Sequence, residues 1–404
     1  MRMISRNIQL QMENSSWIRK MFEKGAELKQ KFGAENVFDF SLGNPDLPPP
    51  GNTREILIEL AGQLSQSLGM GYCPNAGLPI FRAALAEMLV REQQVELKAA
   101  HVVVTCGAAG ALTAFFRAIL EPGDEVLCPA PYFVEYGAYC GHFGGVLRPV
   151  PSIAPSFQLN LEAIKATVSE KTRVVLINSP NNPTGCIYPL ETLRELGAWI
   201  TGINERRERP VFLVSDEPYR FLVYDGVEVP PVLPLTPFAL VLGSFSKKLS
   251  IPGERVGYLA ANPQMPDVQT LINAVTLTNR TLGFVNAPVI GQRMVLKMLD
   301  AGVDIGIYLR RRDAMAAVLR AAGISFSMPA GAFYFFPEAP GGDDVKFVDA
   351  LLQRNILAVP GTGFGYPGYF RLSFSVEEDV IRRSASAFKE AVASSRRARF
   401  QSTS

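Results

Sequence analysis

Short apolar runs alternate with longer amphipathic stretches between about residues 100 and 260 of the chain. The runs are rich in Val, Ile and Leu and mostly lack a polar residue at every second position, which is typical of strands covered on both faces. Stretches such as Ala109–Leu120 and Pro189–Asn204 have the length and spacing of amphipathic helices. This alternation predicts an α/β domain with helices on both faces of a mainly parallel, seven-stranded sheet. The predicted strands are Val102–Thr105, Glu125–Pro129, Val146–Val150, Arg173–Asn178, Val211–Ser215, Ala239–Gly243 and Val256–Ala260.

The two ends of the chain have a different pattern. Residues 15–31 predict one amphipathic helix, which precedes the Pro-rich segment Asn44–Gly51. Long helical patterns follow residue 290, and the short apolar runs Gly331–Phe336 and Phe370–Phe374 predict two further strands. We therefore expect a large domain over residues 46–289 and a smaller α+β domain built from residues 1–45 and 290–404.

Composition narrows the classes of partner. The net charge is only +2, so the chain has no strong field with which to attract nucleic acid or an anionic membrane surface. No apolar run reaches the ~20 residues that cross a bilayer, and the first residues lack the apolar core of a signal peptide. Five cysteines without a CxxC motif fit reduced thiols in a cytoplasmic protein, and two histidines argue against a metal site built from histidine.

Chemistry is expected at the carboxyl ends of the strands, where open α/β sheets bind their ligands. No phosphate-binding GxxxxGK[ST], no GxGxxG after a strand and no GxSxG is present. Lys247 follows a predicted buried strand, where partial desolvation lowers the pKa of an amine and makes it a nucleophile for a Schiff base. Ser244, Ser246 and Arg255 around it suit a phosphate. Taken alone, however, this Lys-Lys segment is more often a solvated turn.

Three other strand ends carry polar or small residues. Asp216 ends an apolar strand and either caps a helix or faces a cationic group, and Tyr219 follows it by three residues. Asn182 lies in Asn178–Gly185, which is also a plausible turn. Gly107, Ala108 and Ala109 open a helix whose free amides suit a phosphate, although a tight strand–helix turn needs the same small residues. Together the four ends describe one ligand with a carbonyl, a cationic ring nitrogen and a phosphate.

At these residues the sequence resembles the fold-type I enzymes that use pyridoxal 5'-phosphate (PLP), and in particular the class I/II, aspartate aminotransferase-like family. The resemblance covers Phe38 to Arg371 and includes SxSK followed by GxRxG, NNPTG and DxxY in order. It implies an aminotransferase that moves an amino group from an L-amino acid to a 2-oxo acid by a ping-pong mechanism. PLP would be held as an internal aldimine on Lys247, and the aspartate/2-oxoglutarate pair is a candidate substrate set.

The resemblance implies a role for each matching residue. Lys247 would move the proton at the substrate Cα, Asp216 would keep the pyridine nitrogen protonated, and Tyr219 would hydrogen-bond the ring oxygen with Asn182. Arg371 would grip the substrate α-carboxylate. The other implied roles are stacking on the ring by Phe133, or by Tyr132 if the register slips by one; phosphate binding by Ser244, Ser246, Arg255 and the amides of Gly107, Ala108 and Ala109; and closure over the carboxylate by the backbone of Gly43.

Two residues imply a homodimer with shared active sites. Tyr72 matches a tyrosine that reaches the phosphate of the neighbouring subunit, and Arg280 lies near the position of an arginine that binds a second substrate carboxylate across the dimer. The chain departs from its relatives at Ala108 and Ala109, where a hydroxyl is common, and at Phe133, where the aspartate enzymes have Trp. Two alternatives remain open: a PLP-dependent carbon–sulfur β-lyase of the same fold, and a non-catalytic PLP-binding regulatory module.

Overall fold

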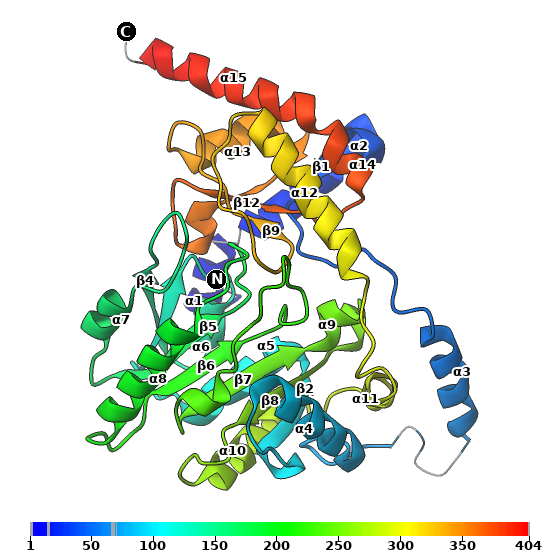
Figure 1. The fold of residues 1–404 in the computed structure, drawn as a ribbon, viewed down its shortest axis with the longest axis vertical. Coiled ribbons are helices and arrows are strands. Elements are labelled where there is room, and N and C mark those ends of the chain that lie inside the picture. Colours follow the sequence, from blue (N-terminus) through cyan, green and yellow to red (C-terminus); the bar gives the residue numbers. More distant parts are fainter. Residues whose placement is uncertain (1–2, 14–16, 66–68, 70, 403–404) are drawn as a thin grey trace.

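A seven-stranded sheet forms the centre of the molecule (Figure 1). The computed structural model describes residues 3–13, 17–65, 69 and 71–402. All strand pairs in this sheet are parallel except those of β8, which runs antiparallel to both of its neighbours. Its strands, in the order in which they pair, are β2 (Val102–Cys106), β8 (Val256–Ala261), β7 (Ala239–Ser244), β6 (Phe212–Asp216), β5 (Thr172–Asn178), β3 (Glu125–Ala130) and β4 (Val146–Pro151).

Burial on both faces explains the continuous apolar runs of the strands. In β5, Val175 and Ile177 join one hydrophobic cluster, whereas Val174 and Leu176 join a second. Because successive side chains of a strand point to opposite faces, these clusters lie on the two sides of the sheet. All seven predicted strands are therefore confirmed, with bounds shifted by one residue at most; Val211, for example, directly precedes β6.

Helices from the middle of the chain pack around this sheet. The predicted helices at Ala109–Leu120 and Pro189–Asn204 are confirmed as α5 (Gly107–Ile119) and α8 (Leu190–Asn204). In this part of the chain the other helices are α3 (Thr53–Gln63), α4 (Pro79–Gln93), α6 (Tyr136–Gly141), α7 (Leu161–Thr167), α9 (Phe245–Lys248), α10 (Val268–Thr281) and α11 (Val289–Leu296). Strand β2 leads directly into α5, so the first turn of this long helix lies at the end of a sheet strand.

The two chain ends meet in a smaller unit above the sheet in Figure 1. Helix α2 (Trp17–Phe32) corresponds to the helix predicted at residues 15–31, of which residues 15 and 16 lie outside the described part. β1 (Phe38–Asp39) pairs with β10 (Ile356–Leu357), and β12 (Phe370–Ser373) pairs between β11 (Val359–Pro360) and β9 (Tyr334–Phe335). The remaining helices of this unit are α12 (Ile305–Ala321), α13 (Asp344–Leu352), α14 (Glu378–Arg383) and α15 (Ala385–Ser402). Helix α1 (Arg6–Glu13) lies lower in the view of Figure 1, level with β4.

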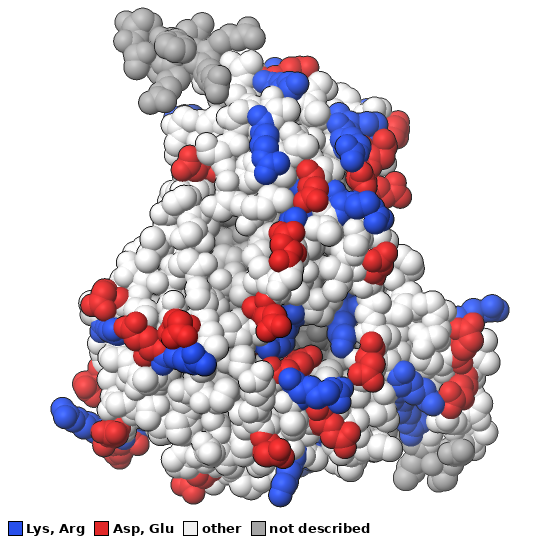
Figure 2. Space-filling view, viewed as in Figure 1, with Lys and Arg blue, Asp and Glu red and all other residues white. Residues whose placement is uncertain are grey.

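Charges of both signs are interspersed over the face shown in Figure 2, which agrees with the small net charge of the sequence. Among the described residues no helix is both long and apolar enough to span a membrane.

Candidate active site

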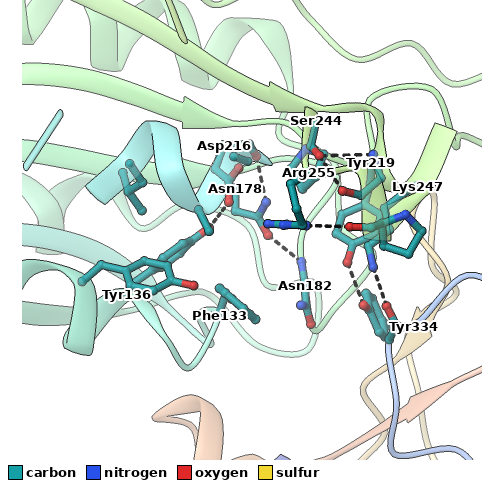
Figure 3. A pocket seen from close by; sticks show the side chains of 18 of the residues that line it. Phe133, Tyr136, Asn178, Asn182, Asp216, Tyr219, Ser244, Lys247, Arg255 and Tyr334 are labelled. Carbon is teal, nitrogen blue, oxygen red and sulfur yellow. Dashed lines mark hydrogen bonds between the residues drawn. The ribbon is translucent and has the colours of Figure 1, made fainter. Parts of the chain in front are cut away.

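A cavity of about 320 Å³ lies at the carboxyl ends of β5, β6 and β7, beside the first turn of α5 (Figure 3). β9 and β12 of the smaller unit each contribute one lining residue, so the cavity lies between the two parts of the fold. The sequence-predicted residues that it brings together are Gly43, Ala108, Ala109, Phe133, Asn182, Asp216, Tyr219, Ser244, Ser246, Lys247, Arg255 and Arg371. Phe133 rather than Tyr132 lines the cavity.

Three predicted site residues do not line this cavity. Gly107 lies immediately beside it, under the guanidinium of Arg255. Tyr72 is 90 % exposed, and Arg280 is exposed near the end of α10. A single chain therefore does not place Tyr72 or Arg280 in its own cavity.

Lys247 is held at the cavity by a short helix that follows β7 directly. The Ser244 hydroxyl caps this helix by accepting a hydrogen bond from the Ser246 amide at 3.2 Å. The Lys247 Nζ donates to the carbonyl oxygen of Gly43 at 2.7 Å. Burial, together with the positive charges of Arg255 and Arg371, lowers the pKa of the Lys247 amine to about 8. A minor fraction of this amine is neutral near physiological pH, far more than for an ordinary lysine, and can act as a nucleophile or base.

Asp216 ends β6 as a buried carboxylate with one satisfied oxygen. Its Oδ2 accepts a hydrogen bond from the Tyr136 hydroxyl at 2.6 Å, whereas its Oδ1 is buried and has no partner among the described residues. Burial raises the pKa of the Asp216 carboxyl to about 6, and the hydrogen bond from Tyr136 opposes that rise. The Asn178 side chain fixes the strand end by donating to the Asp216 backbone carbonyl at 2.7 Å. An unpartnered buried carboxylate oxygen calls for a cationic or hydrogen-bonding ligand group.

Small residues and donors form an anion site at the start of α5. Gly107 has a φ of +71°, and a Cβ there would lie 2.6 Å from Nη2 of Arg255. The glycine therefore lets the guanidinium approach the free amides of the helix N-terminus. Arg255 Nη2 also donates to the Cys106 carbonyl at 3.4 Å, and the Ser244 and Ser246 hydroxyls lie 2.8 Å apart beside it. Amides, hydroxyls and a guanidinium together suit a phosphate.

Arg371 is a buried cation on β12, with only 1 % of its surface exposed. Its Nη1 donates to the Asn182 side-chain oxygen at 3.1 Å, and its Nη2 donates to the Ser41 carbonyl at 2.5 Å. The rings of Tyr334 and Phe364 flank the guanidinium at 4.8 and 4.9 Å. Burial lowers its pKa, and Nε has no partner among the described residues. Because no described carboxylate pairs with it, Arg371 is free to bind the carboxylate of a ligand.

Sequence reasoning missed several lining residues, of which Tyr136, Asn178 and Tyr334 contact predicted ones. Tyr136 follows Phe133 by three residues, and Asn178 is the last residue of β5, so strand-end position was a usable signal for Asn178 alone. Tyr334 lies in a two-residue strand of the smaller unit and had no such signal.

Known proteins resemble the chain over most of its length. The model of the family described as "Aminotransferase class I and II" matches residues 35–388. A probable aspartate/prephenate aminotransferase of Aquifex aeolicus is 35% identical, covering 91% of this chain and 94% of the relative. An amino transferase of Eubacterium rectale, known as a crystal structure, has a TM-score of 0.92 at 36% identity, covering 97% of this chain and 99% of that chain. The aspartate aminotransferase of Thermus thermophilus with maleate has a TM-score of 0.86 at 29% identity, covering 97% and 100%. The strands, the cavity and these matches agree, and the chain belongs to the class I and II aminotransferases.

Proposed function

We propose that this aminotransferase binds PLP in the cavity at Lys247 and transfers amino groups between a dicarboxylic L-amino acid, such as aspartate, and a 2-oxo acid such as 2-oxoglutarate. One observation carries the cofactor assignment: the unpartnered Oδ1 of Asp216 shares a cavity with a lysine whose pKa is lowered to about 8. A protonated pyridine nitrogen satisfies that oxygen, and an aldehyde is the natural partner of that amine.

The other lining residues fit the rest of the cofactor. Tyr219 and Asn182 would bind the ring oxygen, and Phe133 would stack on the ring. The amides of Gly107, Ala108 and Ala109, the hydroxyls of Ser244 and Ser246 and the guanidinium of Arg255 would bind the phosphate. When bound, PLP supplies a conjugated ring that accepts electrons from the bond broken at the substrate Cα.

The protein groups then supply binding and proton transfer. Arg371 would bind the substrate α-carboxylate, and its flanking rings keep water from competing for that charge. The Lys247 amine, partly neutral near pH 7, would remove the proton from the substrate Cα. In the cofactor-free protein the carbonyl of Gly43 holds this amine at the cavity.

We also propose a homodimer in which each subunit completes the cavity of the other. Tyr72 and Arg280 are both exposed and come from neighbouring segments, because Asn75 donates to the Val285 carbonyl at 2.9 Å and Asn279 donates to the Asn75 carbonyl at 3.4 Å. Large apolar side chains are exposed nearby in sequence, namely Leu57, Ile58, Ile80 and Leu277. This surface suits a second copy that receives Tyr72 at its phosphate site and Arg280 at the side-chain carboxylate of its substrate.

The names of relatives support the dicarboxylate class. The Aquifex relative is a probable aspartate/prephenate enzyme, and the Thermus enzyme has a structure with maleate, which is a dicarboxylate.

We further propose a cytoplasmic location, which the free state of all five cysteines supports. The proposed large domain spans residues 46–289, and the small domain spans 1–45 and 290–404; the pairing of β1 with β10 supports this assembly.

Half-reaction spectroscopy tests the proposal. The PLP form is mixed with single amino acids, and conversion to the pyridoxamine form is followed by absorbance. We expect aspartate and glutamate to react fastest.

Arg280→Ala should slow the reactions of aspartate and glutamate far more than those of alanine or phenylalanine. Arg206→Ala, which removes another exposed arginine, should change none of these four reaction rates. Equal losses on all four amino acids would refute the role of Arg280. Release of pyruvate and ammonia from cysteine without an oxo acid would favour a β-lyase instead.

A further inference from the structure

Tyr334 joins the two parts of the fold at the cavity. It lies on β9 of the smaller unit, is 1 % exposed, and its hydroxyl lies 2.7 Å from the hydroxyl of Tyr219, which follows β6 of the central sheet (Figure 3). The two rings meet edge to face, with centroids 5.6 Å apart and an interplanar angle of 86°. Packing on both sides therefore fixes this pair of hydroxyls.

Tyr219 and Tyr334 together have two hydroxyl protons, and the hydrogen bond between them uses only one. Each phenol carries one proton and can also accept, so one hydroxyl donates to the other and the second proton remains available. Neither hydroxyl has another hydrogen-bond partner among the described residues, and both residues line the cavity. The second proton is therefore directed at a ligand in the cavity.

The surroundings favour Tyr334 as the donor of the pair. The Arg371 guanidinium lies 4.8 Å from the Tyr334 ring and opposes the rise that burial causes in the pKa of Tyr334. Burial and the neighbouring Tyr334 raise the pKa of Tyr219 well above its usual value, and Arg371 opposes that rise as well. Tyr219 has a single proton, and it can donate that proton to the ring oxygen of the cofactor only if its own oxygen accepts from Tyr334.

The Tyr334 hydroxyl is also confined on its other side. A Cβ on Gly43 would lie only 2.1 Å from it, so the glycine leaves the space that this hydroxyl occupies. The same glycine carbonyl holds the Lys247 amine at 2.7 Å. Tyr334 therefore contacts both the tyrosine proposed to bind the ring oxygen and the segment that holds the lysine.

We propose that Tyr334 is a positioning residue for amino transfer: its hydroxyl donates to the Tyr219 oxygen and thereby directs the Tyr219 proton to the ring oxygen of the bound cofactor. This inference rests on the proposed function. A chain of hydrogen bonds polarises each member, so Tyr219 becomes a stronger donor and stabilises negative charge on the ring oxygen. With PLP bound, that oxygen would hold a proton less tightly.

The visible absorbance of the PLP-loaded enzyme changes with pH when the bound cofactor gains or loses that proton. The midpoint of this titration therefore tests the role of Tyr334. The Tyr334→Phe variant removes only the donor, so the midpoint of the titration should rise by a few tenths of a pH unit. Tyr219→Phe should raise it further. We also expect the dissociation constant for PLP to increase about three- to tenfold in Tyr334→Phe, as for the loss of one buried hydrogen bond.

Tyr224→Phe is the matched control. Tyr224 is a buried tyrosine that donates to the Ala332 carbonyl at 2.7 Å and does not line the cavity, so its loss should lower stability without moving the midpoint. A wild-type midpoint in Tyr334→Phe beside a raised midpoint in Tyr219→Phe would overturn the role of Tyr334 alone. Absence of a lysine-dependent visible band in the wild-type enzyme would instead overturn the proposed function.

Discussion

Replacement of Tyr136 by Phe should make the stability of the cofactor-free protein depend more steeply on pH. The substitution removes the 2.6 Å hydrogen bond to Asp216 Oδ2 and leaves a buried carboxyl with no side-chain donor among the described residues. A hydrogen bond to a charged group contributes about 1.5–3 kcal/mol. The same bond to the neutral carboxyl is worth about 1 kcal/mol, so it favours the ionised form by about 0.5–2 kcal/mol. At 1.36 kcal/mol for each pH unit, its loss should raise the pKa of Asp216, already about 6, by roughly half a pH unit to one and a half.

The sign of the effect follows from the raised pKa. A carboxyl whose folded pKa exceeds its usual value of 3.8 contributes stability that is present below pH 3.8 and is lost as the pH rises through about 6. In Tyr136→Phe this loss continues to higher pH. We therefore expect the variant to be less stable than the wild type by about 1.5–3 kcal/mol at pH 8, where the carboxylate is ionised in the wild type. At pH 5 the carboxyl is mostly neutral, and the deficit should fall to about 1 kcal/mol.

Urea denaturation at pH 5 and pH 8, at one fixed protein concentration, measures both deficits. The Tyr224→Phe variant is again the control, because its acceptor is the uncharged carbonyl of Ala332 and its deficit should be the same at both pH values. Equal deficits of Tyr136→Phe at pH 5 and pH 8 would show that the hydrogen bond does not stabilise the ionised carboxylate more than the neutral carboxyl, and would refute the reasoning.

Three other perturbations have equally direct outcomes. Gly107→Ala should weaken PLP binding at least tenfold, because its Cβ would meet Arg255 at 2.6 Å. In the control Gly123→Ala the φ is +90° and no atom lies within 4 Å of the added Cβ, so this variant should lose only about 1–2 kcal/mol of stability. The dissociation constants of the two variants for PLP are compared. Reductive trapping of an aldehyde at residue 247 of the cofactor-free protein, located by peptide mapping, should increase through about pH 8. The labelled peptide should be lost in Lys247→Ala but kept in Lys248→Ala, whose wild-type amine donates to the Leu299 carbonyl. A midpoint near pH 10 would contradict the lowered pKa of Lys247. Arg371→Lys should raise KM for amino acids roughly ten- to hundredfold. The guanidinium is hydrogen-bonded to both Asn182 and Ser41, and an ammonium cannot make these bonds and bind a carboxylate in the same geometry. An unchanged KM in steady-state assays would exclude Arg371 from carboxylate binding.

Strand positions and the chemistry at strand ends could be predicted from the sequence. Buried strands such as β5 have an apolar residue at nearly every position, and the carboxyl ends of parallel strands meet at one edge of the sheet. Asp216 and Lys247 were therefore identifiable without knowledge of which strands are neighbours. The resemblance to a known family added Arg371 and Gly43, which lie outside the central sheet.

Contacts between distant segments could not be predicted in the same way. Tyr136 meets Asp216 across 80 residues of sequence, and Tyr219 meets Tyr334 across 115. These contacts depend on the orientation of the short helix α6, and on where the strand predicted at Gly331–Phe336, observed as β9, lies relative to the central sheet. The apolar pattern predicts the strand but not its neighbours. The exposure of Tyr72 and Arg280 likewise depends on the folded surface, and their proposed partners belong to a second subunit.

The visible spectrum of the purified protein with PLP tests the central claim most directly. The wild type and Lys248→Ala should each develop a visible band that aspartate bleaches in a single turnover, whereas Lys247→Ala should develop no such band. A visible band of unchanged shape and intensity in Lys247→Ala would contradict the assignment of Lys247 as the residue that holds the cofactor.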